Sequence, residues 1–311
     1  MTAIALCFPG QGSQAQGMAS GLIDLPAAAQ LLEVAASEGL DLTAALGGDD
    51  SSLRATDVAQ PALLFVEIVL TGLVSTPGLD VVGVAGHSVG EYTALVAAGA
   101  LDAADAMRAV IARGRAMAAM RQGTMAALLG AEVALAEEVC AAVSQTGVGP
   151  VVVANVNAPG QVVISGTVEG VEASIAMARE RGVRKAMRLN VGGAFHSPLM
   201  RDAAAGFEPV VAALPLRDAR FPVVCNVDGT AVTDAGGLRA RLRSQLVSAV
   251  RWTDCVTTLV GLGAEALVEV GPGGVLTGLA RRIVPGTRAL AVADGDAAAG
   301  LTAALAAVAH A

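Results

Sequence analysis

Aromatic side chains are scarce in this chain. One Trp, one Tyr and five Phe make up 2% of its 311 residues, although 54% of the residues are hydrophobic. The core must therefore be built mainly from Ala, Val and Leu. Together with 37 glycines, such a composition favours an α/β protein, in which helices pack closely on a sheet. The length allows one large domain or two smaller ones.

Positive charge is also scarce. Lys185 is the only lysine, the net charge at pH 7 is −8, and no run of basic residues has aromatic residues interleaved with it. Nucleic-acid binding is therefore not expected. The four cysteines are far apart in the sequence and have no histidine nearby, which excludes a recognisable zinc site and a disulfide framework. We accordingly expect no metal, and a reduced, cytoplasmic setting.

Membrane-targeting features are lacking as well. The N-terminus has no basic segment followed by a long apolar stretch, as a signal peptide would have. The most apolar segment, 62–74, is interrupted by Glu67, and Asp57 and Asp80 lie just beyond its ends. We expect this segment to be too short and too charged to span a bilayer, so that the protein is soluble and has no membrane partner.

The spacing of apolar residues predicts two kinds of structure along the chain. The first and last parts have α/β texture, with helices expected at 61–73 and 91–100 and strands at 80–85, 221–227 and 266–270. The middle part reads strand–helix–strand–strand–helix–strand, with its last strand at 184–191. That order is typical of a ferredoxin-like unit. We therefore predict a large α/β domain formed by 1–123 and 192–311, with a ferredoxin-like subdomain inserted at 124–191.

One motif places a nucleophile in the large domain. Gly86-His87-Ser88-Val89-Gly90 is a G-x-S-x-G sequence between a predicted strand and a predicted helix. In that context the serine lies on a strained turn with its hydroxyl exposed, as in α/β-hydrolases, and the following helix directs its N-terminal amides at the reacting centre. A glycine-rich turn with an incidental serine is the alternative. The order of strand, motif and helix favours the nucleophile and an α/β-hydrolase-like core around a parallel sheet.

A base for this serine is found by elimination among three histidines. His310 is the penultimate residue, and the side chain of His87 is expected to project away from the Ser88 hydroxyl. His196 remains as the candidate general base. Between Ser88 and His196 the only aspartates are Asp102 and Asp105, both at the start of a helix soon after the motif. A serine–histidine dyad, oriented by a backbone carbonyl or an amide side chain, therefore fits better than a hydrolase triad.

Two further features allow more than one interpretation. Arg113 lies in the apolar helical segment MRAVIARGRAM, where an inward guanidinium could bind a carboxylate in a bidentate manner, although a surface ion pair is the ordinary alternative. The first predicted strand runs into Pro9-Gly10-Gln11-Gly12, which resembles the opening of a dinucleotide-binding unit. No strand ending in an acidic residue follows at the spacing that a ribose requires, which argues against a dinucleotide.

Six motifs together resemble the malonyl-CoA:acyl-carrier-protein transacylases, the stand-alone acyltransferases of fatty-acid and polyketide synthesis. They are FPGQGSQ, GHSVGE, ARGRAM, NVNAPGQVVISG, GAFHSPLM and EVGPGGVLTGL, and they cover essentially the whole chain in the family's order. The resemblance implies malonyl transfer from malonyl-CoA to the phosphopantetheine thiol of an acyl carrier protein, without a cofactor. We expect a monomer.

The resemblance also implies roles for individual residues. Ser88 would be the acylated nucleophile and His196 its base, and Arg113 would bind the malonyl carboxylate. Gln11 and the backbone amide of Val89 would form the oxyanion hole. Gln245 stands where the family orients the histidine through a main-chain carbonyl. The basic residues near the end of the inserted subdomain are a candidate surface for an acidic carrier protein: Arg179, Arg181, Arg184, Lys185 and Arg188.

Other functions remain open from the sequence. A serine hydrolase or esterase on the same motif is weakened by the missing acid and by an arginine directed at the acyl group. A non-catalytic carrier-binding protein is disfavoured because every chemical position is intact. The acyltransferase subunit of a malonate decarboxylase is poorly separated from the fatty-acid or polyketide role.

Overall fold

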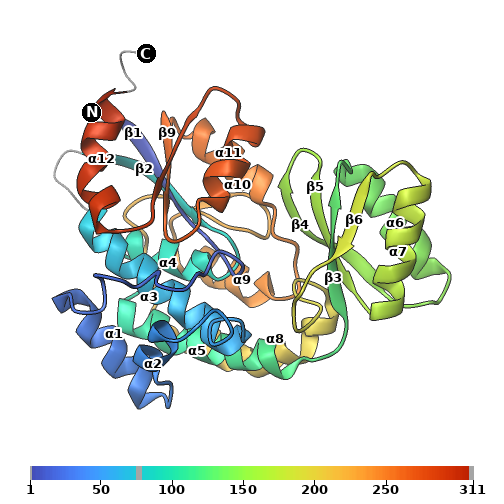
Figure 1. The fold of residues 1–311 in the computed structure, drawn as a ribbon, viewed down its shortest axis with the longest axis horizontal. Coiled ribbons are helices and arrows are strands. Elements are labelled where there is room, and N and C mark those ends of the chain that lie inside the picture. Colours follow the sequence, from blue (N-terminus) through green and yellow to red (C-terminus); the bar gives the residue numbers. More distant parts are fainter. Residues whose placement is uncertain (1, 75–78, 308–311) are drawn as a thin grey trace.

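Two sheets organise the chain, and the larger one is mostly parallel (Figure 1). The computed structural model describes residues 2–74 and 79–307. The large sheet has the order β10-β9-β1-β2-β7-β8, and all neighbouring strands are parallel except β7 and β8. Its strands are β1 (Ala3–Phe8), β2 (Asp80–Gly86), β7 (Val223–Val224), β8 (Ala231–Val232), β9 (Ala266–Val270) and β10 (Arg288–Val292).

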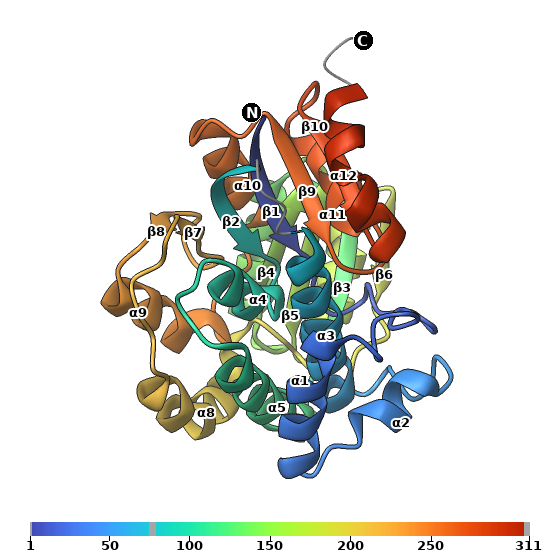
Figure 2. The ribbon, with the colours of Figure 1, turned by 90° about the vertical axis from the view of Figure 1, so that its left-hand side faces the viewer.

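Helices cover both faces of this sheet, as the alternation of side chains along β1 shows. Ile4, Leu6 and Phe8 point into a core formed with helices on one face, whereas Ala5 and Cys7 point into a second core on the other face. The first face is covered by α3 (Thr56–Val74), α4 (Gly90–Ala97) and α12 (Gly295–Ala307). Helix α5 (Ala103–Ala119) packs on α3 and α4 and lies below the sheet in Figure 2. The second face is covered by α10 (Trp252–Gly261) and α11 (Val275–Ile283). The remaining helices of the large body are α1 (Pro26–Ser37), α2 (Leu42–Gly47), the 3₁₀ turn η1 (Pro198–Met200), α8 (Arg201–Ala213) and α9 (Ala235–Gln245).

Helix α3 is the one described helix that is long and apolar enough to cross a membrane by length and composition, and 67% of its apolar window is buried inside the protein. It packs on α5 and β9 as a core helix. The helix predicted at 61–73 begins earlier, at Thr56, so Pro61 lies inside it. Thr56, Ala59 and Gln60 are buried, and packing of this first turn extends the helix upstream of the proline.

The second sheet is antiparallel and has the order β4-β5-β3-β6. The first and third strands in the chain, β3 and β5, are therefore central, as the split βαβ arrangement requires. Figure 1 shows α6 and α7 on the side of this sheet that faces away from the large body. The elements are β3 (Thr124–Leu129), α6 (Val133–Gln145), β4 (Val151–Ala158), β5 (Gln161–Gly166), α7 (Val168–Glu180) and β6 (Lys185–Arg188). All lie within 124–191, and the division of the chain at these limits stays a prediction.

Three predicted elements are shorter in the structure. The strand expected at 184–191 is limited to Lys185–Arg188, which lie in register with β3, and a last backbone hydrogen bond runs from the Leu189 amide to the Met125 carbonyl. The helix expected at 91–100 ends at Ala97, where Gly99 adopts a φ of 73° and the Ala100 amide bonds back to Leu95. The strand expected at 221–227 is limited to Val223–Val224, because the chain turns immediately afterwards.

Candidate active site

Ser88 lies on a sharp turn between β2 and α4, which we call the nucleophile elbow (residues 86–90). Its φ of 54° is in the left-handed region, which residues other than glycine rarely adopt. A Cβ at Gly86 would lie 1.9 Å from the backbone of Gly90, and one at Gly90 would lie 2.3 Å from the Phe8 carbonyl oxygen. The two glycines are therefore required because the elbow closes on itself and on the end of β1.

His196 reaches the elbow from the loop that returns from the small sheet. Its Nε2 lies 2.8 Å from the Ser88 Oγ, and its Nδ1 lies 3.1 Å from both the Gln245 and the Ser248 carbonyl oxygens. Because both carbonyls can only accept, Nδ1 bears the hydrogen and Nε2 presents its lone pair to the serine hydroxyl. Burial, aided by the positive charge of Arg113 and by His87, lowers the pKa of His196 to about 3. The imidazole is thus neutral near pH 7 and able to take a proton.

No carboxylate among the described residues bonds to His196. Asp102 and Asp105 instead pair with Arg217 and Arg108, at 2.6 and 3.1 Å. The predicted position of Asp102 at the start of a helix is right, since it is the residue before α5, but its side chain does not cap that helix. His87 bonds through Nε2 to the Asn157 Oδ1, 2.9 Å away, and His310 lies outside the described residues. The pairing of Ser88 with His196 therefore matches the dyad expected from the sequence.

Arg113 is a fully buried guanidinium beside the nucleophile. Its Nη1 donates to the Gln60 Oε1 at 2.6 Å, and its Nη2 donates to the Gln245 Oε1 at 3.0 Å and to the Ser88 Oγ at 3.1 Å. Its Cζ lies 5.9 Å from the centre of the Tyr92 ring. All of these partners are neutral, and Nε has no acceptor within the described part of the chain. A buried positive charge without an anion in contact favours the binding of an anionic group.

The loop after β1 completes the surroundings of Ser88. A Cβ at Gly10 would lie 2.6 Å from the His87 carbonyl oxygen, so this loop lies directly against the elbow. The Gln11 Nε2 donates to the Thr56 Oγ1 at 3.2 Å, while the backbone amides of Gln11 and Val89 have no acceptor in residues 2–74 and 79–307. Unpaired N–H groups are what a developing oxyanion needs, and Gln11 and Val89 line the same cavity as Ser88. No helix begins before Pro26, so the loop lacks the helix N-terminus that a dinucleotide pyrophosphate uses.

These groups line one cavity of about 170 Å³ between the two sheets. Its polar end is formed by the large body, and its other wall comes from the small sheet. Lining residues of the large body are Gln11, Gln60, His87, Ser88, Val89, Arg113, Met117, Phe195 and His196; the rest are Met125, Asn155, Asn157, Val163, Leu189 and Val191. The site thus brings the Ser88 hydroxyl and a neutral imidazole together with a buried guanidinium whose hydrogen-bond partners are all neutral.

Comparison with known proteins agrees with this geometry. Residues 6–295 match the family model described as acyl transferase domain. The malonyl CoA-acyl carrier protein transacylase of Bacillus subtilis is 39% identical over 300 residues, covering 94% of each chain. The chain belongs to the malonyl-CoA:acyl-carrier-protein transacylase family.

Solved structures of this family share the fold. The malonyl-CoA:acyl carrier protein transacylase of Xanthomonas oryzae has a TM-score of 0.90 and 40% identity, over 98% of this chain and 99% of that one. A malonyl-transacylase in complex with a type II PKS acyl-carrier protein has a TM-score of 0.89 and 35% identity, over 96% of this chain and 98% of that one. The α/β core with a parallel sheet and a small antiparallel sheet is therefore the family's architecture.

Two polar residues of this transacylase-family chain that contact the site were not predicted from the sequence. Gln60 holds Arg113, and its signal was a polar residue within the apolar, buried segment of α3. Asn226 accepts from the Ser88 N–H at 2.7 Å and donates to the Gly86 carbonyl oxygen at 2.7 Å. Asn226 had no local signal, because it falls within the segment 221–227 that the sequence predicts as a strand.

Proposed function

We propose that this protein transfers a malonyl group from malonyl-CoA to the phosphopantetheine thiol of an acyl carrier protein, through a malonyl ester on Ser88. The observation that supports this most strongly is Arg113, a buried cation with neutral partners only, whose Nη2 lies 3.1 Å from the Ser88 Oγ. A malonyl group has a carboxylate that can pair with this guanidinium while its thioester carbonyl meets the serine. The names of the family relatives agree with this substrate.

In the first half-reaction, the Ser88 Oγ attacks the thioester carbonyl as His196 Nε2 takes the hydroxyl proton. Negative charge develops on the carbonyl oxygen, where the amides of Gln11 and Val89 donate hydrogen bonds. The tetrahedral intermediate then expels coenzyme A as a thiolate, which receives the proton from His196. The products are malonyl-Ser88 and free coenzyme A. The Gln245 and Ser248 carbonyls stabilise the imidazolium that forms between these two steps.

In the second half-reaction, the carrier's thiol replaces coenzyme A at the mouth of the cavity. His196 takes the thiol proton, the thiolate attacks the ester carbonyl, and Ser88 leaves with the proton returned by His196. This sequence is ping-pong. The narrow cavity and the Arg113–carboxylate pair hold the ester so that a thiol, rather than water, reaches its carbonyl.

The lowered pKa of His196 predicts the pH below which the acylation rate declines. Acylation needs the neutral imidazole, and the pKa in the folded protein is about 3 instead of 6.5. The acylation rate at limiting malonyl-CoA should therefore stay level as the pH falls through 6.5 and decline only near the lower value. Rapid-quench measurements of coenzyme A release against pH would check this. An acid limb centred between about pH 6 and 7, the range of an unperturbed histidine, would contradict it.

A carrier-docking surface is proposed around Arg184 and Lys185, which are both exposed. Three neighbours in the predicted patch have partners: Arg179 donates to the Ala186 carbonyl oxygen, and Arg181 and Arg188 pair with Glu138 and Glu172. Reversing both free charges, Arg184→Glu with Lys185→Glu, should raise the KM for an acidic carrier about tenfold. The KM for free pantetheine as acceptor should not change. Equal KM values for the carrier before and after the change would refute this surface.

The proposed activity is tested by mixing malonyl-CoA, a phosphopantetheinylated acyl carrier protein and the enzyme, and by measuring the mass of the carrier. We expect malonyl-carrier to form with the native chain and not with Ser88→Ala. Free malonate formed faster than malonyl-carrier would instead indicate a hydrolase. We also propose that the enzyme acts as a cytoplasmic monomer, since a single chain supplies every polar group of the site.

A further inference from the structure

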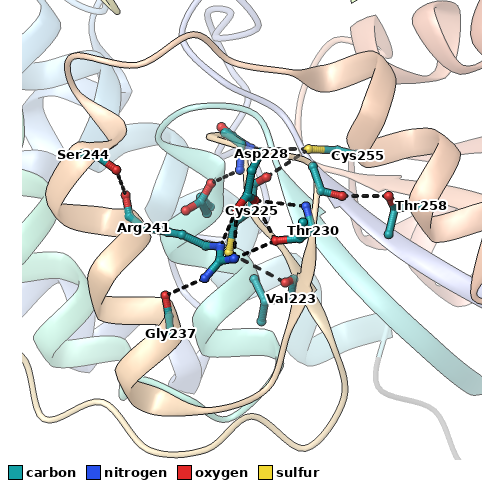
Figure 3. Close-up of polar contacts among 12 residues, drawn as sticks. Val223, Cys225, Asp228, Thr230, Gly237, Arg241, Ser244, Cys255 and Thr258 are labelled. Carbon is teal, nitrogen blue, oxygen red and sulfur yellow. Dashed lines mark hydrogen bonds and ion pairs between the residues drawn. The ribbon is translucent and has the colours of Figure 1, made fainter.

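The turn after β7 (residues 225–230) has more supporting contacts than a surface connection needs. Its backbone closes on itself through the Cys225 amide bonded to the Thr230 carbonyl at 3.0 Å and the Gly229 amide bonded to the Cys225 carbonyl at 2.9 Å. From α10, Thr258 donates to the Gly229 carbonyl at 2.7 Å and Cys255 lies against the Cys225 carbonyl at 3.6 Å (Figure 3). The turn is therefore held in a single conformation.

A second set of contacts joins the same turn to α9. Arg241 forms an ion pair with Asp228 at 2.8 Å and donates to the Thr230 Oγ1 at 2.9 Å, as Figure 3 shows. Asp228 also accepts from the Thr230 hydroxyl at 2.7 Å. Arg241 lies one helical turn before Gln245, whose carbonyl bonds to His196. The turn and the residue that orients the histidine are thus fixed relative to each other.

The residue that this turn presents to the elbow is Asn226, which is 1% exposed. Its Oδ1 accepts from the Ser88 N–H and its Nδ2 donates to the Gly86 carbonyl oxygen, both at 2.7 Å. Its own N–H donates to the Glu91 Oε2 at 2.8 Å, and its carbonyl accepts from the Arg251 amide at 2.9 Å. One carboxamide therefore bridges the two peptide groups that flank His87, at the point where the φ of Ser88 is 54°.

We propose that Asn226 is a positioning residue for the nucleophile. Its carboxamide holds the left-handed conformation of Ser88, which places Oγ between His196 Nε2 and Arg113 Nη2. Because it takes up the Ser88 N–H, the adjacent Val89 N–H is the one left to stabilise an oxyanion. The inference rests on the proposed acylation of Ser88 and extends it to a residue that touches neither the substrate nor the base.

Rapid mixing with malonyl-CoA, followed by intact-protein mass spectrometry, separates positioning from binding. In Asn226→Ala the maximal acylation rate should fall on the order of 100-fold, as expected when a nucleophile is misplaced. The concentration of malonyl-CoA that gives half this rate should change less than about threefold, because Arg113 still binds the carboxylate. Inactivation by phenylmethanesulfonyl fluoride, which has no carboxylate, should slow in the same proportion.

Thr258→Val is the matched control, since it removes one hydrogen bond from the same turn without touching the elbow. Its acylation rate should stay within about threefold of the native rate. Equal losses in Asn226→Ala and Thr258→Val would overturn the inference. So would a folded Asn226→Ala that acylates at nearly the native rate, or one that loses only apparent affinity for malonyl-CoA.

Asn226→Asp provides a nearly isosteric second variant in case Asn226→Ala fails to fold. The ionised carboxyl can accept from the Ser88 N–H but cannot donate to the Gly86 carbonyl, whereas the protonated carboxyl can do both. The ratio of variant to native acylation rate should therefore rise as the pH is lowered from about 8 to about 5, where the native His196 stays neutral. Glu91 accepts from the Asn226 N–H, and burial raises its pKa to about 7; it is present in both enzymes, which is why the ratio is compared. A ratio that does not change with pH would overturn the inference. If native enzyme forms no malonyl adduct, the proposed function fails, while the sulfonyl fluoride still reports whether Asn226 positions Ser88.

Discussion

Arg113→Ala is expected to lower malonyl transfer by roughly 100- to 1,000-fold while leaving acetyl transfer from acetyl-CoA unchanged or faster. Arg113 is the one positive charge that contacts Ser88 among the described residues, and no carboxylate there forms an ion pair or hydrogen bond with it. A malonyl carboxylate that enters the cavity without the guanidinium would be buried unpaired, which costs about 2–5 kcal/mol. An acetyl group has no such charge, so its rate of transfer should not fall when the guanidinium is removed. Initial rates of coenzyme A release from the two donors measure both effects.

Two variants test this expectation. Arg108→Ala is the matched control, because Arg108 lies on the same helix but is exposed and pairs with Asp105; its rates should stay near the native ones. Arg113→Lys keeps a charge but cannot bridge Gln60 and Gln245 as a planar fork does, so its rate should lie between those of Arg113→Ala and the native enzyme. If Arg113→Ala slowed malonyl and acetyl transfer equally, Arg113 would support the fold rather than bind the carboxylate.

His196→Ala is expected to slow acylation by about 100- to 10,000-fold, the usual contribution of a general base. The physical reason is the 2.8 Å contact from Nε2 to the Ser88 hydroxyl, made by an imidazole whose tautomer is fixed by two carbonyls. Without it, the hydroxyl proton has no acceptor in reach. Stopped-flow detection of coenzyme A release measures the rate, and added imidazole should restore part of it by entering the vacated space.

A His196→Ala enzyme that retained a tenth or more of the native rate would exclude His196 as the base. His87→Asn is a useful comparison, because His87 also lines the cavity and lies next to Ser88 but bonds to Asn157. We expect a smaller loss for His87→Asn than for His196→Ala. A larger loss for His87→Asn than for His196→Ala would show that His87, and not His196, is the base.

The parts of the site that follow from local spacing were predictable from the sequence. Gly86 and Gly90 around Ser88 are required because an added Cβ at either position would collide with backbone, so strand, elbow and helix can be recognised in a short stretch. His196 could be selected as the candidate base because the sequence has only three histidines. The βαββαβ order of the small sheet followed from apolar periodicity, and its strand order agrees.

The parts that depend on distant packing were not predictable. Asn226 reaches Ser88 across 138 positions in the sequence, and the strand predicted at 221–227 did not indicate that the chain turns after Val224. Gln60 meets Arg113 only because α3 and α5 pack side by side. The same packing extends α3 upstream of Pro61, against the expectation from the proline alone. Such contacts are set by tertiary structure, on which local propensity has little influence.

The measurement that tests the central claim most directly is intact-protein mass spectrometry after brief mixing with malonyl-CoA. The account predicts a single malonyl adduct on the native chain and none on Ser88→Ala. The adduct should disappear when a phosphopantetheinylated carrier is added, with the malonyl mass recovered on the carrier. Absence of an adduct, with coenzyme A and free malonate accumulating together, would contradict the acyl-serine intermediate and the transfer that depends on it.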